Sequence, residues 1–278
     1  SQHLELYPDA NAYYLKLQLA HKLGVEQDQI TIGNGSNDVL DLIARSFLTE
    51  GREAVFSQHG FLLYALVTQA CGATANIAPA LPRDSVQPYG HDLAAMLERI
   101  NERTAVIFIA NPNNPTGTWV SADDLQQFIQ QVPEQVVVVI DEAYFEFVRE
   151  AKCPDSIDYL KSDKIVVGLR TFSKAYGLAG LRIGYGLMPS FLAELLNRVR
   201  QPFNVNLLAQ AGAIAALEDE DFLAKTVALV ANESGSITRI SAFRVAVAKA
   251  AKEFEHEQLD AEKARRDAYL GADATLDG

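Results

Sequence analysis

The chain has 278 residues, of which 49% are hydrophobic and 22% are charged, which is ordinary usage for a folded globular protein. Its formal net charge of −12 argues against nucleic acid or an anionic membrane surface as a partner. Two cysteines, Cys71 and Cys153, are too few for the disulfide framework of a secreted protein, and no apolar run is long enough to span a bilayer. We therefore expect a cytoplasmic protein without a membrane segment.

Seven short runs rich in β-branched residues alternate with segments of helical periodicity. The runs cover residues 29–32, 53–57, 74–78, 104–110, 136–140, 164–169 and 182–187. Apolar residues recur at helical spacing in segments 36–48, 58–71, 91–100, 121–131 and 190–200. Apolar strands that alternate with helices are typical of a mostly parallel sheet covered on both faces. The pattern predicts the α/β class, with three layers (α/β/α) around a mostly parallel seven-stranded sheet.

Composition divides the chain into three expected parts. Residues 1–28 predict an N-terminal arm and a helix, and residues 29–230 contain the seven strands and form the large domain. Residues 231–278 are rich in Ala, Glu, Lys and Arg, and apolar residues from Phe243 to Phe254 recur there at helical spacing. We expect a helical C-terminal segment in this last part.

Polar clusters follow three successive strands. They are NPNNPTG after 104–110, DEAY after 136–140, and RTFSK after 164–169. Ligands bind at the carboxyl ends of strands in open α/β sheets, so we expect these clusters to share one crevice. The side chains that they would bring together are Asn114, Asp141, Tyr144, Ser173 and Lys174.

A fourth strand end, GNGSND after 29–32, opens a helix at Ser36 and Asn37. The free backbone N–H groups of such a helix start would make an anion site. The segment resembles half of a dinucleotide-binding fingerprint, but Asp38 stands where the third glycine is required. This departure argues against a nicotinamide dehydrogenase.

Each cluster has a simpler interpretation when it is taken alone. NPNNPTG is rich in turn-forming residues, and a single lysine such as Lys174 is usually a surface charge. Their conjunction, in this order and each at a strand end, is what indicates a site. These groups suit the cofactor pyridoxal 5′-phosphate. A lysine can form a Schiff base with its aldehyde, and an aspartate can keep its ring nitrogen protonated. A helix start, a serine and an arginine can bind its phosphate. No metal-ligand spacing is present in the sequence.

The run from about residue 7 to 230 resembles the fold-type I aminotransferases, and within them the histidinol-phosphate aminotransferase family. SKAYGLAGLRIGY looks like the family's lysine segment, which implies Lys174 as the Schiff-base lysine and Ser173 and Arg182 as phosphate ligands. DEAY matches the motif in which Asp141 would pair with the pyridine nitrogen and Tyr144 would bond the ring hydroxyl. The resemblance implies the large-domain fold of aspartate aminotransferase.

Two further motifs of this family carry cofactor roles. NNPTG implies that Asn114 also bonds the ring hydroxyl. GSND implies that the backbone N–H groups of Ser36 and Asn37 bind the phosphate.

Three aromatic segments extend the resemblance. FSQHGFLLY implies that Phe61 stacks on the cofactor ring; the alternative is a core residue. YPDANAYYLK implies that Tyr7 reaches the phosphate in the partner subunit's site, and hence a homodimer; a loose N-terminal side chain is the alternative. QPFNVN, residues 201–206, points most toward the histidinol-phosphate group, unless it is only a link after a helix.

The resemblance has limits at both ends. The family carries an N-terminal substrate loop with an Asn–Glu–Asn–Pro motif and a small C-terminal domain with a substrate-binding arginine. We find no match to either, and Arg239 and Arg244 do not take that arginine's role. We therefore expect the usual N-terminal segment and small domain to be missing from this sequence.

These observations predict a pyridoxal-phosphate-dependent aminotransferase, with Lys174, Asp141 and Tyr144 as its catalytic residues. The resemblance implies amino transfer from histidinol phosphate to 2-oxoglutarate in histidine biosynthesis, so an amino-phosphate substrate and a 2-oxo acid would be the small-molecule partners. Two alternatives remain open. The chain could be a truncated or remodelled homologue that binds the cofactor without turnover, or a phospho-amino-acid decarboxylase of the same fold.

Overall fold

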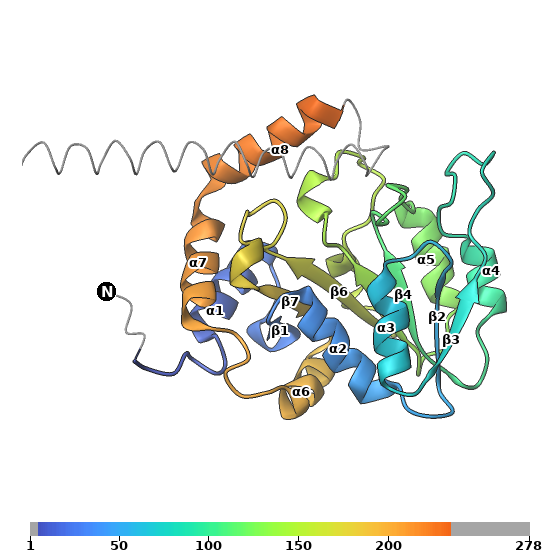
Figure 1. Cartoon of the computed structure of the whole chain (residues 1–278), viewed down its shortest axis with the longest axis horizontal. Helices are drawn as coiled ribbons and strands as arrows, with labels where there is room; N and C mark the ends of the chain where they lie inside the picture. Colours follow the sequence, from blue (N-terminus) through green and yellow to red (C-terminus); the bar gives the residue numbers. More distant parts are fainter. Residues whose placement is uncertain (1–4, 235–278) are drawn as a thin grey trace, which may run out of the picture.

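The computed structural model describes residues 5–234, which fold around one seven-stranded sheet with helices on both faces (Figure 1). The strands are β1 (Ile30–Gly33), β2 (Glu53–Ser57), β3 (Thr74–Ala78), β4 (Thr104–Ala110), β5 (Val137–Asp141), β6 (Ile165–Thr171) and β7 (Gly184–Leu187). Their order in the sheet is β1-β7-β6-β5-β4-β2-β3. Among these strands, β7 runs in the direction opposite to the other six. The three-layer, mostly parallel α/β prediction is confirmed.

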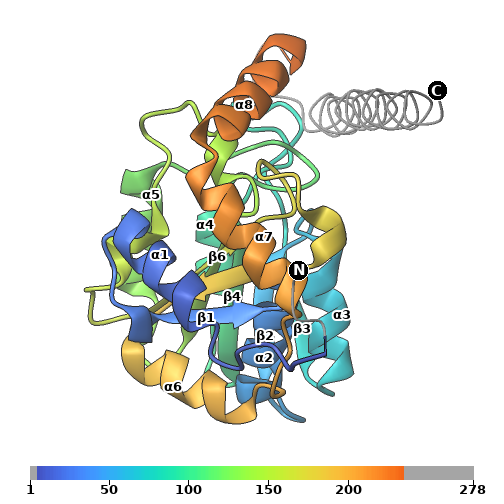
Figure 2. The same ribbon diagram turned by 90° about the vertical axis from the view of Figure 1, so that its left-hand side faces the viewer.

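The described residues form eight α-helices, seven of which pack on the faces of the sheet. They are α1 (Tyr13–Leu23), α2 (Ser36–Phe47), α3 (Leu62–Ala70), α4 (Leu93–Glu98), α5 (Ala122–Gln131), α6 (Ser190–Val199), α7 (Leu207–Glu218) and α8 (Glu220–Ser234). Helices α2, α3 and α6 pack on one face of the sheet, in a core with alternate residues of β4, β5 and β6. Helices α4 and α5 pack on the opposite face, against the intervening strand residues, and α1 packs with α7 on that face over β1 and β7 (Figures 1 and 2).

Local sequence explains where several helices begin. The side chains of Asp92, Ser121 and Asn206 each accept a hydrogen bond from a backbone N–H three residues on, at the starts of α4, α5 and α7. Helix α3 differs from the prediction, because it begins at Leu62 and not at residue 58. The N–H of Gly60 donates to the carbonyl of Ser57 at 2.8 Å and forms a turn before the helix. This turn leaves Phe61 at the helix start, close to the carboxyl end of β2.

The C-terminal part of the chain is described only as far as α8. The expected boundary at residue 230 falls inside this helix, which continues to Ser234. The amphipathic helices expected around Phe243 to Phe254 lie outside the described residues. Within residues 5–234, no helix combines the length and apolarity needed to cross a bilayer.

Candidate active site

The pairing register of the sheet brings the predicted strand ends to one edge. Asp141, the last residue of β5, pairs with Ala110 of β4 on one side and with Leu169 of β6 on the other. At the same edge, Gly184 of β7 pairs with Thr171 of β6 and with Gly33 of β1. The NPNNPTG, DEAY and RTFSK clusters and the start of α2 therefore meet at this edge, as predicted.

The carboxylate of Asp141 is buried at this edge, with 8% of the residue exposed. Its Oδ2 accepts a hydrogen bond from the Tyr64 hydroxyl at 3.0 Å, and its Oδ1 accepts one from the Ala143 N–H at 3.2 Å. Burial raises the pKa of Asp141, while these two hydrogen bonds and the positive charge of Lys174 lower it. The site therefore holds a desolvated carboxylate whose ionised form would be stabilised by a cationic N–H partner.

Lys174 lies just beyond the carboxyl end of β6, half-buried. Its Nζ is 5.3 Å from the centroid of the Tyr144 ring, and Tyr144 is itself buried. Its charge also acts on Asp141. The structure thus brings together the three residues that the sequence predicts to be catalytic.

Ser173 and Arg182 form a polar pair beside the lysine. Arg182 Nη1 donates to Ser173 Oγ at 3.2 Å, and the Thr171 hydroxyl donates to the same oxygen at 3.0 Å. Arg182 adopts the left-handed backbone conformation, with φ of 61°, which is uncommon for a residue other than glycine. Such a conformation is costly and is often found at functional sites.

Two glycines allow this pair to approach the first turn of α2. A Cβ on Gly35 would lie 2.4 Å from Arg182 Nη2, and a Cβ on Gly184 would lie 2.3 Å from the backbone nitrogen of Ser36. Ser36 and Asn37 are the first residues of α2, and no side chain caps this helix start at Gly35. Because the first N–H groups of a helix lack intrahelical acceptors, they are suited to bind an anion together with Ser173 and Arg182, and this role stays a prediction.

Asp38, which stands at the position of the missing third glycine, has a structural contact. Its Oδ2 accepts hydrogen bonds from the Asn34 N–H at 2.9 Å and from Asn204 Nδ2 at 2.7 Å. Asn204 belongs to QPFNVN, so this residue ties that segment to the start of α2. The residue that departs from the dinucleotide fingerprint therefore stabilises the loop before α2.

The NPNNPTG loop next to Asp141 is held in place by side-chain hydrogen bonds. The side-chain amide of Asn111 bonds the backbone of Val120 twice, at 2.9 and 3.1 Å. Asn113 Nδ2 donates to the His59 carbonyl at 3.0 Å, and Asn113 Oδ1 is buried without a hydrogen-bond partner among the described residues. Asn114 is half-buried in this loop, and its bond to a ring hydroxyl stays a prediction.

The two predicted aromatic residues lie in different places. Phe61 is half-buried and contacts Tyr64 edge-on, with ring centroids 5.9 Å apart. Its predicted stacking on a cofactor stays a prediction. Tyr7 is 82% exposed, and its ring stacks on Phe203 at 4.8 Å. This contact joins the N-terminal arm to QPFNVN, so Tyr7 is positioned by that segment.

The family of the chain follows from a comparison of sequences. Residues 1–261 match the family model described as aminotransferase class I and II. The chain belongs to this family. Histidinol-phosphate aminotransferase 2 of Pseudomonas fluorescens (strain Pf-5) is 54% identical over 241 residues, which are 87% of this chain and 63% of the relative. The enzyme of the same name from Methylococcus capsulatus is 53% identical over 239 residues, covering 86% and 64%.

A solved aminotransferase structure has the same fold. The histidinol-phosphate aminotransferase of Sinorhizobium meliloti, in complex with pyridoxal-5′-phosphate, superposes with a TM-score of 0.77 at 32% identity. The alignment covers 83% of this chain and 61% of that one. The chain thus spans less than two thirds of the length of these aminotransferases.

Sequence reasoning missed Tyr64 in this aminotransferase site. It lies three residues after Phe61 in an apolar segment, where a tyrosine is most simply interpreted as core. A buried tyrosine hydroxyl requires a hydrogen-bond partner, and that requirement is the only signal that could have drawn attention to it.

A buried ion pair supports the DEAY segment from the opposite face of the sheet. Arg170 Nε donates to Glu142 Oε2 at 2.9 Å, and Arg170 Nη2 bonds Asp155 at 2.6 Å. Ser156 donates to both oxygens of Glu142, from its N–H at 2.8 Å and from its hydroxyl at 2.6 Å. The residue after Asp141 is thereby held in place.

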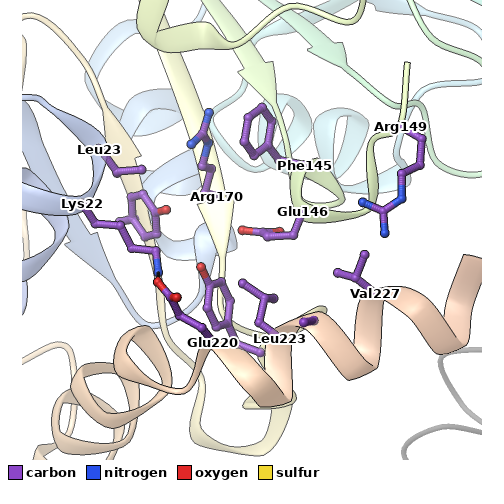
Figure 3. Close-up of a pocket in the computed structure, with 12 residues that line it drawn as sticks. Lys22, Leu23, Phe145, Glu146, Arg149, Arg170, Glu220, Leu223 and Val227 are labelled. Carbon is purple, nitrogen blue, oxygen red and sulfur yellow. Dashed lines mark ion pairs between the residues drawn. The ribbon is translucent and has the colours of Figure 1, made fainter. Parts of the chain in front are cut away.

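A cavity of about 530 Å³ lies next to this ion pair, and none of the predicted cofactor residues lines it (Figure 3). Helix α8 forms one wall, and the Glu146 carboxylate lies between Arg170 and Leu223. Glu146 Oε2 is buried and has no hydrogen-bond partner among the described residues. Burial raises the pKa of Glu146 to about 7. The cavity is separate from the strand-end site, because its polar groups lie on the other face of β6.

Proposed function

We propose that this chain forms the cofactor-binding part of a pyridoxal-phosphate-dependent aminotransferase that transfers an amino group from histidinol phosphate to 2-oxoglutarate. The observation that carries the proposal is the meeting of Lys174, Asp141 and an anion site at one sheet edge. The names of relatives at about half identity support the substrate. We expect this enzyme in the cytoplasm, in accord with its two free cysteines.

The residues present fit the cofactor. The start of α2, Ser173 and Arg182 would hold its phosphate, in a cradle that side chains at Gly35 and Gly184 would fill. Asp141 would hold the ring nitrogen, because a buried carboxylate with a raised pKa is stabilised by an N–H cation. Tyr144 and Asn114 would bond the ring hydroxyl, and Phe61 would lie against the ring.

The chemistry that the group supplies when bound is an electron sink for the bonds at the substrate's amino carbon. Asp141 keeps the proton on the ring nitrogen by remaining ionised beside it. Lys174 Nζ would hold the cofactor at rest, would be displaced when the substrate's amine takes its place, and would then move a proton at the substrate carbon, as general base and acid. The buried Tyr144 ring below Nζ excludes water from one side of that transfer.

The proposal includes a homodimer in which Tyr7 serves the site of a second copy. Tyr7 is too exposed to be a core residue, and several other large side chains of the arm, α1 and α6 are also exposed. They include Leu6, Tyr13, Tyr14, Phe191 and Val199. Exposed apolar surface of this kind favours burial against a partner. Sedimentation analysis of the parent and of Tyr7→Ala, with cofactor affinity measured in both, tests this part.

The experiment for the cofactor is the visible absorbance of the purified chain with pyridoxal phosphate, followed by borohydride reduction and mass spectrometry of the lysine peptides. We expect a band and a label on Lys174, neither of which Lys174→Ala retains. Lys161→Ala, which removes an exposed lysine, is the matched control. A folded parent without a band contradicts the proposal.

A second assay separates the aminotransferase from the alternatives. Histidinol phosphate and 2-oxoglutarate should yield glutamate at a rate that depends on Lys174. A bound cofactor without glutamate formation would favour the homologue that binds the cofactor without turnover. Release of carbon dioxide from a phospho-amino acid would favour the decarboxylase.

A further inference from the structure

We propose that Tyr64 is a positioning residue whose hydroxyl fixes the Asp141 carboxylate for the ring nitrogen of the cofactor. The inference rests on the proposed function, because it assigns Asp141 to that nitrogen. Tyr64 lies in α3 and Asp141 ends β5, so the bond joins a helix to a strand end across the core face.

The aromatic rings around Tyr64 fix the direction in which its hydroxyl points. The residue is fully buried, and its ring stacks on Phe108 at 4.9 Å with an interplanar angle of 7°. Phe56 and Phe61 contact the same ring edge-on, at 6.1 and 5.9 Å. Because three rings enclose it, the side chain cannot turn to another acceptor, and the hydroxyl stays on Asp141 Oδ2.

Two donors on different oxygens set the plane of the carboxylate. Tyr64 bonds Oδ2 and the Ala143 N–H bonds Oδ1, at 3.0 and 3.2 Å. An ionised carboxylate has about four acceptor sites, so lone pairs remain for a further donor. The two bonds determine where these lone pairs point. Tyr64 therefore acts on the cofactor through Asp141 and not by contact.

The charges around the pair favour this role. Asp141 faces the Tyr64 hydroxyl from α3, the Ala143 N–H from its own segment, and Lys174 from the segment after β6. Burial and the Asp141 charge raise the pKa of Tyr64 well above its ordinary value, so the proton stays on the tyrosine. A hydroxyl that donates to a carboxylate favours the ionised form, and it thereby offsets part of the desolvation of Asp141.

The simpler interpretation is that Tyr64 only fills the core. Tyr64→Phe keeps the ring and its three aromatic neighbours and removes only the oxygen. Tyr159→Phe is the matched control, because Tyr159 is also buried and its hydroxyl bonds the Ala122 carbonyl at 3.4 Å, in the core of the opposite sheet face. A structural role alone would change thermal stability in both variants and leave the titration of Asp141 unchanged.

The first measurement uses the cofactor-free chain. Carbon-13 NMR of the Asp141 carboxyl should show its pKa rising by about one unit in Tyr64→Phe, as expected for loss of a hydrogen bond to a charged group. Tyr159→Phe should match the parent. This result does not depend on pyridoxal phosphate, so it is separate from the test of the proposed function.

The second measurement uses the loaded chain. In Tyr64→Phe, the Kd for pyridoxal phosphate should rise about tenfold. The midpoint pH of the absorbance band should also move upward, because a less protonated ring puts less positive charge near Lys174. A band in the parent with the same Kd and midpoint in Tyr64→Phe overturns the inference and leaves the proposed function intact. If the parent has no band, the proposed function fails.

A second variant guards against a misfolded Tyr64→Phe protein. Tyr64→3-fluorotyrosine keeps the hydroxyl and makes it a stronger donor. The pKa of Asp141 should then fall below that of the parent. A shift in the same direction in both variants would contradict a hydrogen-bond mechanism and favour a packing effect.

Discussion

Asp141 and Glu142 are consecutive residues, both are buried, and burial raises the pKa of both, yet they face opposite sides of the sheet. Glu142 has a guanidinium partner in Arg170 and two hydrogen bonds from Ser156. Asp141 accepts hydrogen bonds from two neutral donors, and the positive charge of Lys174 acts on it. Glu142, whose oxygens already have several partners, stabilises the fold. Asp141 retains lone pairs that can bind a ligand. A buried charge with lone pairs to spare is the stronger indication of function.

The most direct way to break this comparison is Asp141→Asn. Loss of the charge aimed at the ring nitrogen should lower amino transfer by about 10²–10³-fold. Because asparagine keeps a side-chain oxygen that can accept a hydrogen bond and removes a charge that burial disfavours, the free energy of unfolding should change little. Steady-state kinetics and urea denaturation measure the two effects. Wild-type turnover in this variant would refute the role of Asp141.

Glu142→Gln should show the opposite pattern. Arg170 loses one of its two carboxylates, and removing one member of a buried ion pair costs about 3 kcal/mol of stability. Glu194→Gln, which disrupts an exposed pair with Arg198 on α6, should cost less than about 0.5 kcal/mol. Urea denaturation of the three proteins provides the test, and equal stabilities would show that the buried pair is not structural.

Glu146 extends the comparison to a buried carboxylate oxygen that has no hydrogen-bond partner within residues 5–234. Its pKa is raised from 4.5 to about 7 by burial, so the folded protein binds the proton more tightly than the unfolded chain. The stabilising effect of the protonated group is complete below about pH 4.5 and is lost as the pH rises through 7. The parent should lose up to about 3 kcal/mol over that window.

Glu146→Gln removes this titration. The variant should be more stable than the parent at pH 8, and the difference should shrink toward pH 5. Free energies of unfolding at both pH values measure it. A difference that does not depend on pH would mean that the group does not titrate in this window.

Alanine substitutions at two glycines, one on each face of the sheet, should distinguish the cofactor side from the structural side, with a smaller effect than the changes above. A Cβ on Gly184 would meet the Ser36 nitrogen, and a Cβ on Gly168 would lie 1.9 Å from the Ser156 hydroxyl, beside Glu142. Each alanine should cost about 1–3 kcal/mol of stability through overpacking. Only Gly184→Ala should also weaken cofactor binding, which fluorescence titration can measure. Equal Kd values in both variants would argue against the anion site at α2.

Much of the architecture was predictable, because local chemistry determines it. All seven runs form strands within two residues of their expected bounds. Continuous apolar runs suit a sheet buried on both faces, and this reason applies to every strand except β3, which is mostly exposed at the edge of the sheet. The start of α3 was predicted four residues too early, because residues 57–60 form a turn before the helix. That turn depends on a backbone hydrogen bond between Gly60 and Ser57, which the pattern of side chains does not specify.

By itself, the sequence determined the α/β class, the order of the strand-end clusters and the choice of Lys174 and Asp141, because each depends on residue type next to an apolar strand. Only the tertiary structure decided the strand order, with β7 between β1 and β6, and the close approach of Arg182 to Gly35. It also decided that Tyr64, 77 residues before Asp141 in the chain, is its hydrogen-bond donor. Such contacts depend on how helices pack across a sheet, and no local pattern of residues specifies which distant side chains this packing brings together.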